Sequence, residues 1–247
     1  MNFKDKNILI TGASLGIGAS LGIAFARSGA NLAINYLHHG KEAKKIFREV
    51  EKISPKAFLI KADVSERKSV ESMFEKIVKK FGRIDIVINN AGIITSPSDW
   101  ENISERDWRR TTEVNLKGVF ECCRAGGKLM IKQKYGKIVN ISSLRGILGG
   151  KDVIAYAATK AGVDNLTKSF AEALAPYVNV NGLSLGRIDI GLGKLKNNLE
   201  TKQWVDKNLL KRVGNIDDVI NGVFFLSSDA SSFITGQTLI VDGGVKL

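Results

Sequence analysis

Seven short apolar runs, rich in β-branched residues, recur along the chain. They span residues 7–10, 32–36, 57–60, 84–88, 137–141, 178–185 and 238–241. Strands that are apolar on both faces are typical of parallel sheets covered by helices on both sides. The runs therefore predict about seven strands of one buried parallel sheet.

Segments with helical spacing and charged faces separate these runs. The clearest span residues 19–28, 42–53, 70–81 and 154–175. Strands that alternate with helices predict an α/β fold, here a single-domain Rossmann-type doubly wound sheet over residues 1–247 with helices on both faces. Residues 187–211 have the least regular pattern of apolar and polar positions. They fit either a lid-like substrate segment or an ordinary surface loop.

Size and composition agree with one globular domain. The chain has 247 residues, 44% of them hydrophobic, and this length suits one large α/β domain. No stretch approaches 18 consecutive apolar residues, and an apolar run at Ile8 leaves no room for a signal peptide before it. We therefore expect a cytoplasmic protein without a membrane segment.

The net charge of +12 bears on partners more than on the fold. A basic surface can attract acyl-CoA esters or an acidic acyl carrier protein, but lysines spread along the chain also fit an ordinary solvated surface. No nucleic-acid-binding motif is present, so we expect no nucleic-acid partner. The two cysteines, Cys122 and Cys123, are adjacent and are not expected to pair.

The glycine-rich stretch at residues 12–18 fits two templates. Ser14 could be the nucleophile of a G-x-S-x-G turn, which requires an acid and then a histidine later in the chain. The only histidines are His38 and His39, and no acidic residue lies between Ser14 and His38. The stretch is therefore interpreted as a phosphate cradle, in which glycines let backbone N–H groups and a helix N-terminus approach a phosphate.

Tyr156 and Lys160 form the second candidate constellation. A spacing of four residues places both on one face of a helix. An ordinary tyrosine has a pKa of about 10, and a nearby ammonium group lowers that pKa. Such a pair can exchange a proton with a substrate hydroxyl or carbonyl group.

Together these motifs resemble the classical short-chain dehydrogenase/reductase family, and within it the 3-oxoacyl-[acyl-carrier-protein] reductases. The resemblance covers nearly the whole chain. It rests on residues 11–18, Asp63 with Val64, residues 89–92, Asn115, Ser142 with Ser143, Tyr156 with Lys160, and residues 234–244.

The resemblance implies catalytic roles for four residues. Tyr156 would be the general acid/base, and Lys160 would lower its pKa and hold the nicotinamide ribose. Ser143 would hydrogen-bond the substrate oxygen, and Asn115 would anchor a proton-relay water. No metal is implied. Ser142 is expected to be structural.

The resemblance also implies a set of cofactor contacts. Asp63 and Val64 would contact the adenine, Asn89 would lie against its ribose, and Asn90 would brace the strand. The full set is Gly12, Ser14, Leu15, Gly16, Ile17, Gly18, Tyr36, His38, Asp63, Val64, Asn89, Ala91, Gly92, Tyr156, Lys160, Gly186 and Ile188.

The second predicted strand bears on the choice between NADP(H) and NAD(H). An acidic residue at its end would select NAD through the ribose hydroxyls, but no Asp or Glu follows Tyr36 until Glu42. His38 and His39 could favour a 2′-phosphate. Leu15, however, stands where NADP-preferring relatives often carry Arg or Lys. We expect NADP(H) to be preferred, with NAD(H) left open.

Two departures from the family pattern concern the cofactor. Leu185 precedes Gly186 where a proline is usual, and Ile190 replaces a threonine that helps to hold the cofactor. Cofactor affinity or lid ordering is therefore expected to differ from the family norm, with Ile188 still offering backbone groups.

The resulting functional hypothesis is an NAD(P)(H)-dependent oxidoreductase that moves hydride between nicotinamide and a small-molecule carbonyl or secondary alcohol, with a 3-oxoacyl thioester as one candidate substrate. A sugar or polyol dehydrogenase and a non-catalytic nucleotide-binding protein remain alternatives. The resemblance further implies a homotetramer.

Overall fold

The computed structural model describes residues 1–95, 100–190 and 199–245. Within them, seven parallel strands form one sheet in the order β3-β2-β1-β4-β5-β6-β7. The strands are β1 (Asn7–Ile10), β2 (Asn31–Tyr36), β3 (Phe58–Lys61), β4 (Ile86–Asn89), β5 (Gly136–Ser143), β6 (Val178–Leu185) and β7 (Thr238–Val241). The predicted α/β fold with a parallel sheet is confirmed.

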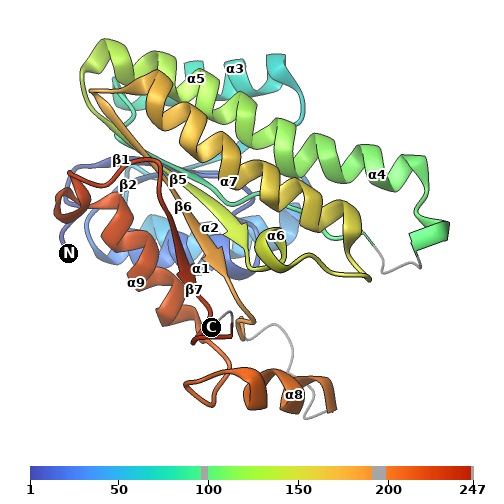
Figure 1. The fold of residues 1–247 in the computed structure, drawn as a ribbon. Helices are drawn as coiled ribbons and strands as arrows, with labels where there is room; N and C mark the ends of the chain where they lie inside the picture. The colour runs from blue at the N-terminus through green and yellow to red at the C-terminus, as the bar shows by residue number, and fades with distance from the viewer. Residues whose placement is uncertain (96–99, 191–198, 246–247) are drawn as a thin grey trace.

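Helices cover both faces of this sheet (Figure 1). One face carries α1 (Gly16–Arg27), α2 (Gly40–Ile53) and α9 (Ile216–Ser227). The other carries α3 (Arg67–Phe81), α5 (Gly118–Gln133) and α7 (Ile154–Leu174), with α4 (Glu105–Thr112) leading into α5 through the π-helical turn η2 (Glu113–Lys117). The remaining helices are η1 (Trp100–Asn102), α6 (Arg145–Leu148), α8 (Leu199–Lys207) and η3 (Asp229–Ser231).

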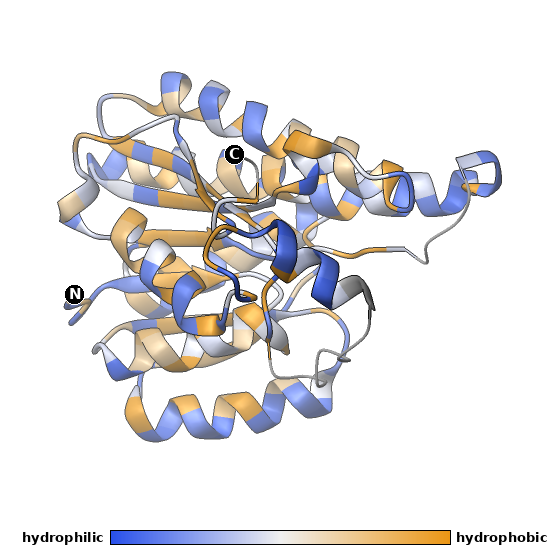
Figure 2. Ribbon diagram, turned by 60° about the horizontal axis from the view of Figure 1, so that its bottom comes forward, coloured by the Kyte–Doolittle hydropathy of each residue, from blue (hydrophilic) through white to orange (hydrophobic). Residues whose placement is uncertain are grey.

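Apolar residues concentrate in the sheet, and polar ones on the outer helix surfaces (Figure 2). Residues of β1 and β4 are fully buried, with Ile8 paired to Leu32 on one side and to Ile86 on the other. Burial on both faces explains why these strands are continuous apolar runs. In the part of the chain that is described, no helix is long and apolar enough to cross a membrane.

The strand order reverses at β1, which pairs with β2 on one side and β4 on the other. In open parallel sheets, ligands bind in the crevice outside the carboxyl ends of the strands at such a switch point. The loops after β1, β4 and β5 all leave the sheet at this edge. The topology therefore places the glycine turn beside the predicted catalytic residues.

The observed element bounds differ from the predicted ones mainly at the ends. The strand expected at residues 84–88 begins at Ile86, because the Ile84 N–H donates to the Gln133 side chain instead of joining the ladder. The helix expected at 154–175 ends at Leu174. Cys122 and Cys123 are both buried and free, and burial raises the pKa of each thiol.

Candidate active site

A cleft of about 830 Å³ opens at the carboxyl edge of the sheet. Fourteen residues assigned from the sequence line it: Gly12, Ser14, Leu15, Ile17, His38, Asp63, Val64, Ala91, Gly92, Ser143, Tyr156, Lys160, Gly186 and Ile188. They come from segments of the chain that lie far apart in sequence. The fold therefore brings the glycine turn and the Tyr156–Lys160 pair to one cavity.

Five assigned residues are not among those that line the cleft: Gly16, Gly18, Tyr36, Asn89 and Asn115. Asn89 is buried, and its amide donates to Asn140 (2.8 Å) and to the Cys123 sulfur. Gly18 packs so tightly that a Cβ there would lie 2.5 Å from the Asn90 amide nitrogen. Asn89 and Gly18 thus pack beneath the cleft, and the assignment of these five residues as site residues stays a prediction.

Asn115 supports the site through the loop that follows β4. It lies in the π-helical turn and is fully buried. Its amide donates to the Ile93 carbonyl and its side-chain oxygen accepts from the Ile93 N–H, both at 2.8 Å. This two-way bond fixes the backbone beside Gly92, which lines the cleft.

The cleft is also lined by residues that were not assigned as contacts from the sequence. They are Asn35, Leu37, His39, Ala62, Asn90, Ile93, Ile94, Arg110, Val114, Ile141, Ser142, Leu185 and Ile190. Most stand at the carboxyl ends of strands, which is the sequence signal that could have identified them. Asn90 braces the strand as expected, because its amide donates to the carbonyls of Thr11 and Gly12.

The turn after β1 has the geometry of an anion cradle. Gly12 has a φ of 62°, and a Cβ there would lie 2.7 Å from the Ala91 Cα, so only glycine fits. Helix α1 begins at Gly16, and no described side chain caps its first turn. Its free N–H groups and positive dipole end fit the pyrophosphate of a dinucleotide.

Helix α7 and strand β5 supply the proton-transfer groups. Lys160 is 4% exposed; its Nζ donates to the Ile141 carbonyl at 2.7 Å and lies 5.6 Å from the centre of the Tyr156 ring. Ser142 donates to the Lys160 carbonyl, which is the structural role expected for it. Ser143 ends β5 on the cleft wall beside Tyr156.

Burial controls the ionisation of this pair. Burial raises the pKa of Tyr156, and the Ser143 hydrogen bond offsets only part of that rise. Burial lowers the pKa of Lys160 to about 8. The pKa of Tyr156 is therefore raised overall, because the cost of desolvating a buried phenolate dominates, and the lowering of this pKa by Lys160 stays a prediction.

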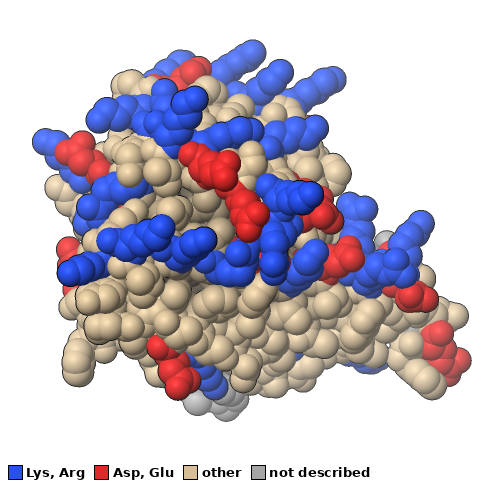
Figure 3. Space-filling model, turned by 90° about the horizontal axis from the view of Figure 1, so that it is seen from above, with Lys and Arg blue, Asp and Glu red and all other residues tan. Residues whose placement is uncertain are grey.

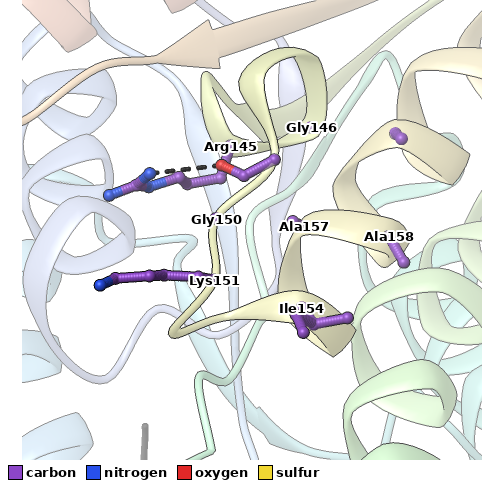
Figure 4. A pocket seen from close by; sticks show the side chains of 9 residues that line it. Arg145, Gly146, Gly150, Lys151, Ile154, Ala157 and Ala158 are labelled. Carbon is purple, nitrogen blue, oxygen red and sulfur yellow. Dashed lines mark hydrogen bonds between the residues drawn. The ribbon is translucent and has the colours of Figure 1, made fainter. Parts of the chain in front are cut away.

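A second hollow of about 460 Å³ lies where α6 meets α7 (Figure 4). Arg145 and Lys151 extend to the same side of it, and Ile154 and Ala158 lie across from them. The Arg145 guanidinium donates to the Gly149 carbonyl and lies 5.5 Å from the centre of the Trp204 ring on α8. The loop after Ser143 is thus in contact with the segment expected to act as a lid.

Known proteins share this architecture over its full length. The family described as enoyl-(acyl carrier protein) reductase matches residues 12–246. The chain is 36% identical over 244 residues to a 3-oxoacyl-[acyl-carrier-protein] reductase of Staphylococcus epidermidis, covering 98% of this chain and 100% of the relative. It is 36% identical over 248 residues to the reductase of that name from Thermotoga maritima, with both chains fully covered.

A solved structure agrees with these relatives. The protein named short-chain dehydrogenase/reductase SDR:glucose/ribitol dehydrogenase, from Brucella melitensis, superposes with a TM-score of 0.89 at 30% identity and full coverage of both chains. Sequence and fold therefore lead to one assignment. The chain belongs to the short-chain dehydrogenase/reductase family and is an NAD(P)-dependent oxidoreductase that acts on carbonyl and CH–OH groups.

Proposed function

We propose that this enzyme reduces 3-oxoacyl thioesters, with NADPH as the preferred hydride donor and Asn115, Ser143, Tyr156 and Lys160 as its catalytic set. The observation that carries the proposal is the meeting of Ser143, Tyr156 and Lys160 on the wall that also holds the glycine turn. Both curated relatives named above are 3-oxoacyl-[acyl-carrier-protein] reductases.

The reduced nicotinamide, when bound, supplies hydride to the carbonyl carbon of the substrate. Tyr156 gives its phenolic proton to the carbonyl oxygen, so that one hydride and one proton complete the alcohol. Ser143 donates a hydrogen bond to the same oxygen while negative charge develops on it. Lys160 holds the cofactor ribose, and its ammonium group stabilises the phenolate that remains.

The ionisation of the pair supports the reductive direction. A raised pKa keeps Tyr156 protonated at neutral pH, which is the form that a general acid requires. Lys160, with a pKa of about 8, is largely charged at the same pH. Alcohol oxidation would need the phenolate form, which burial disfavours.

The adenosine end of the cleft supports NADPH over NADH. Among the described lining residues Asp63 alone carries a carboxylate, and its oxygen accepts hydrogen bonds from the backbone and hydroxyl of Ser65. His38 and His39 line the cleft after β2 and are exposed. No described carboxylate at the end of β2 would repel a 2′-phosphate. NADPH is therefore expected to bind more tightly than NADH, and tighter NADH binding by fluorescence titration would reverse the preference.

The substrate class follows from the relatives and from the surface. Ile93, Ile94 and Ile190 add apolar area to the cleft, which suits an acyl chain. The face covered by α3 and α5 is rich in Lys and Arg (Figure 3), and a basic surface attracts acidic partners such as an acyl carrier protein or coenzyme A. We infer a cytoplasmic setting from the two free, buried thiols.

Residues 187–211 remain our candidate lid. Arg187 contacts Thr201 at 3.4 Å, and Trp204 lies against Arg145. The described ends of the segment therefore contact each other and the loop after Ser143. Residues 191–198 lie outside the described part of the chain. The proposal predicts that shortening this segment raises the KM for long acyl substrates more than for acetoacetyl thioesters.

A substrate panel tests the proposed activity. NADPH oxidation is followed with acetoacetyl-CoA, simple ketones, diketones and sugars. Acetoacetyl-CoA is expected to give the highest kcat/KM. A preference for sugars would favour the polyol alternative, which agrees with the name of the Brucella melitensis protein. Binding of NADPH without turnover of any compound would favour a nucleotide-binding protein that is not an enzyme.

A further inference from the structure

Asn35 is a buried polar residue in the strand β2. It lies near the end of β2, is 2% exposed, and follows the buried residues Leu32, Ala33 and Ile34. Asparagine is depleted in strands, and a buried amide is costly unless its hydrogen bonds are made. A buried asparagine in this strand therefore indicates a specific hydrogen-bonding role for its amide.

The side chain of Asn35 bonds to both neighbouring strands. Its oxygen accepts from the Gly12 N–H at 3.2 Å, in the glycine turn after β1. Its nitrogen donates to the carbonyls of Ile60 (3.3 Å) and Ala62 (3.0 Å), at the end of β3. Since β2 lies between β1 and β3 in the sheet, one amide links the two segments on either side of it.

Both of those segments, one on each side of β2, line the cleft. Gly12, Ser14 and Leu15 line it from the glycine turn, and Ala62 with Asp63 lines it from the end of β3. The backbone of Asn35 adds a further bond, because the Ala13 N–H donates to the Asn35 carbonyl at 2.8 Å. The amides of Gly12 and Ala13, at the start of the turn, are thus both held by Asn35 of β2.

We propose that Asn35 is a positioning residue for the dinucleotide: its amide sets the spacing between the pyrophosphate cradle and the adenine wall. The side chain acts through Gly12 and Ala62. Cofactor affinity therefore depends on it, whereas the chemical step at Tyr156 does not. This role is independent of which carbonyl substrate the enzyme reduces.

Asn181 provides a matched control on the other side of the sheet. It is 1% exposed in β6, its amide donates to the Ile234 carbonyl at 2.8 Å, and its oxygen accepts from the Gln237 N–H at 3.1 Å. It is as buried as Asn35 and also bonds to backbone groups through both ends of its amide, but it ties β6 to the segment before β7. Replacing it removes comparable hydrogen bonds without touching the cofactor turn.

The first test compares Asn35→Leu with Asn181→Leu. The Tm of the protein without cofactor is expected to fall for both variants, since each leaves buried backbone groups unpaired. The Kd for NADPH, measured by fluorescence titration, is expected to rise about tenfold for Asn35→Leu only. At saturating NADPH its kcat should fall by a smaller factor than its Kd rises, because the proposed role concerns cofactor binding. Equal Kd values for the two variants, or a lowered kcat with unchanged Kd, would overturn the proposal.

The second test uses Asn35→Asp and remains informative if the leucine variant does not fold. A protonated carboxyl can accept from the Gly12 N–H and donate to one of the Ile60 and Ala62 carbonyls, whereas a carboxylate would face both carbonyls with no donor. NADP⁺ binding is measured by calorimetry from pH 5 to 9. His38, His39 and Asp63 line the cleft in both proteins, so the ratio of variant to wild-type Kd isolates the new carboxyl. The ratio should rise about tenfold with pH; a flat ratio would contradict the positioning role.

Discussion

At the scale of single residues, burial has the largest effect on the pKa values of the two proton-transfer groups. Lys160 and Tyr156 share a face of α7, yet burial moves the pKa of the lysine down and that of the tyrosine up. Both shifts favour the neutral forms of the two groups. The tyrosine therefore keeps the proton that reduction consumes, and the lysine is the member of the pair that titrates near neutral pH.

A pH profile follows from Lys160. Its ammonium form predominates below its pKa of about 8 and is lost as the pH rises through that value. Because the charged form stabilises the Tyr156 phenolate, kcat/KM for NADPH in the reductive direction is expected to fall above about pH 8.

Lys160→Arg serves as the control for this profile, since a guanidinium group stays charged throughout the range. Its residual activity should show no decline near pH 8. A decline of the same shape in this variant would assign the titration to another group.

At the scale of elements, the strand pattern predicted the sheet well, and the broken helix was missed. Helices α4 and α5 were not identified because α4 is short and polar, and because the π-helical turn that contains Asn115 interrupts the 3.6-residue period between them. The candidate roles of Tyr156 and Ser143 were identified from the family resemblance.

The role of Asn35 was not predicted from the sequence. Its three hydrogen-bond partners become its neighbours only when β1, β2 and β3 align in the sheet.

The glycine turn can be tested with Gly12→Ala. A Cβ at Gly12 would lie 2.7 Å from the Ala91 Cα, in addition to the strain of an alanine at a positive φ. The free energy of unfolding is expected to fall by more than the roughly 1–2 kcal/mol that positive φ alone costs. The Kd for NADPH should rise at least about tenfold.

Gly82→Ala is the matched control, because Gly82 also has a positive φ but no atom would lie within 4 Å of its Cβ. It should show the strain cost alone and bind NADPH normally. Equal losses of stability in the two variants would mean that the contact with Ala91 has no effect.

At the scale of the whole molecule, apolar side chains remain on the surface of the isolated chain. Phe233 is fully exposed, Leu239 on the edge strand β7 is 40% exposed, and Phe120 packs on Phe170 at the outside of α5 and α7. Burial of such side chains would stabilise an association between chains. We propose that copies of the chain cover it in a homotetramer.

Light scattering at micromolar concentration tests this assembly. The expected mass is four times the chain mass of 26.9 kDa. Phe233→Asp should shift the distribution toward smaller species, because a carboxylate at an apolar contact is costly to bury. A wild-type particle with the mass of one chain would contradict the tetramer and leave the fold and site unaffected.

The central claim is that the Tyr156 hydroxyl delivers the proton to the substrate carbonyl. NADPH oxidation with acetoacetyl-CoA, compared between the wild type and Tyr156→Phe at equal NADPH saturation, tests it most directly. We expect Tyr156→Phe to bind NADPH as the wild type does and to lose about 10²–10⁴-fold in kcat. A variant that turns over at the wild-type rate would contradict it.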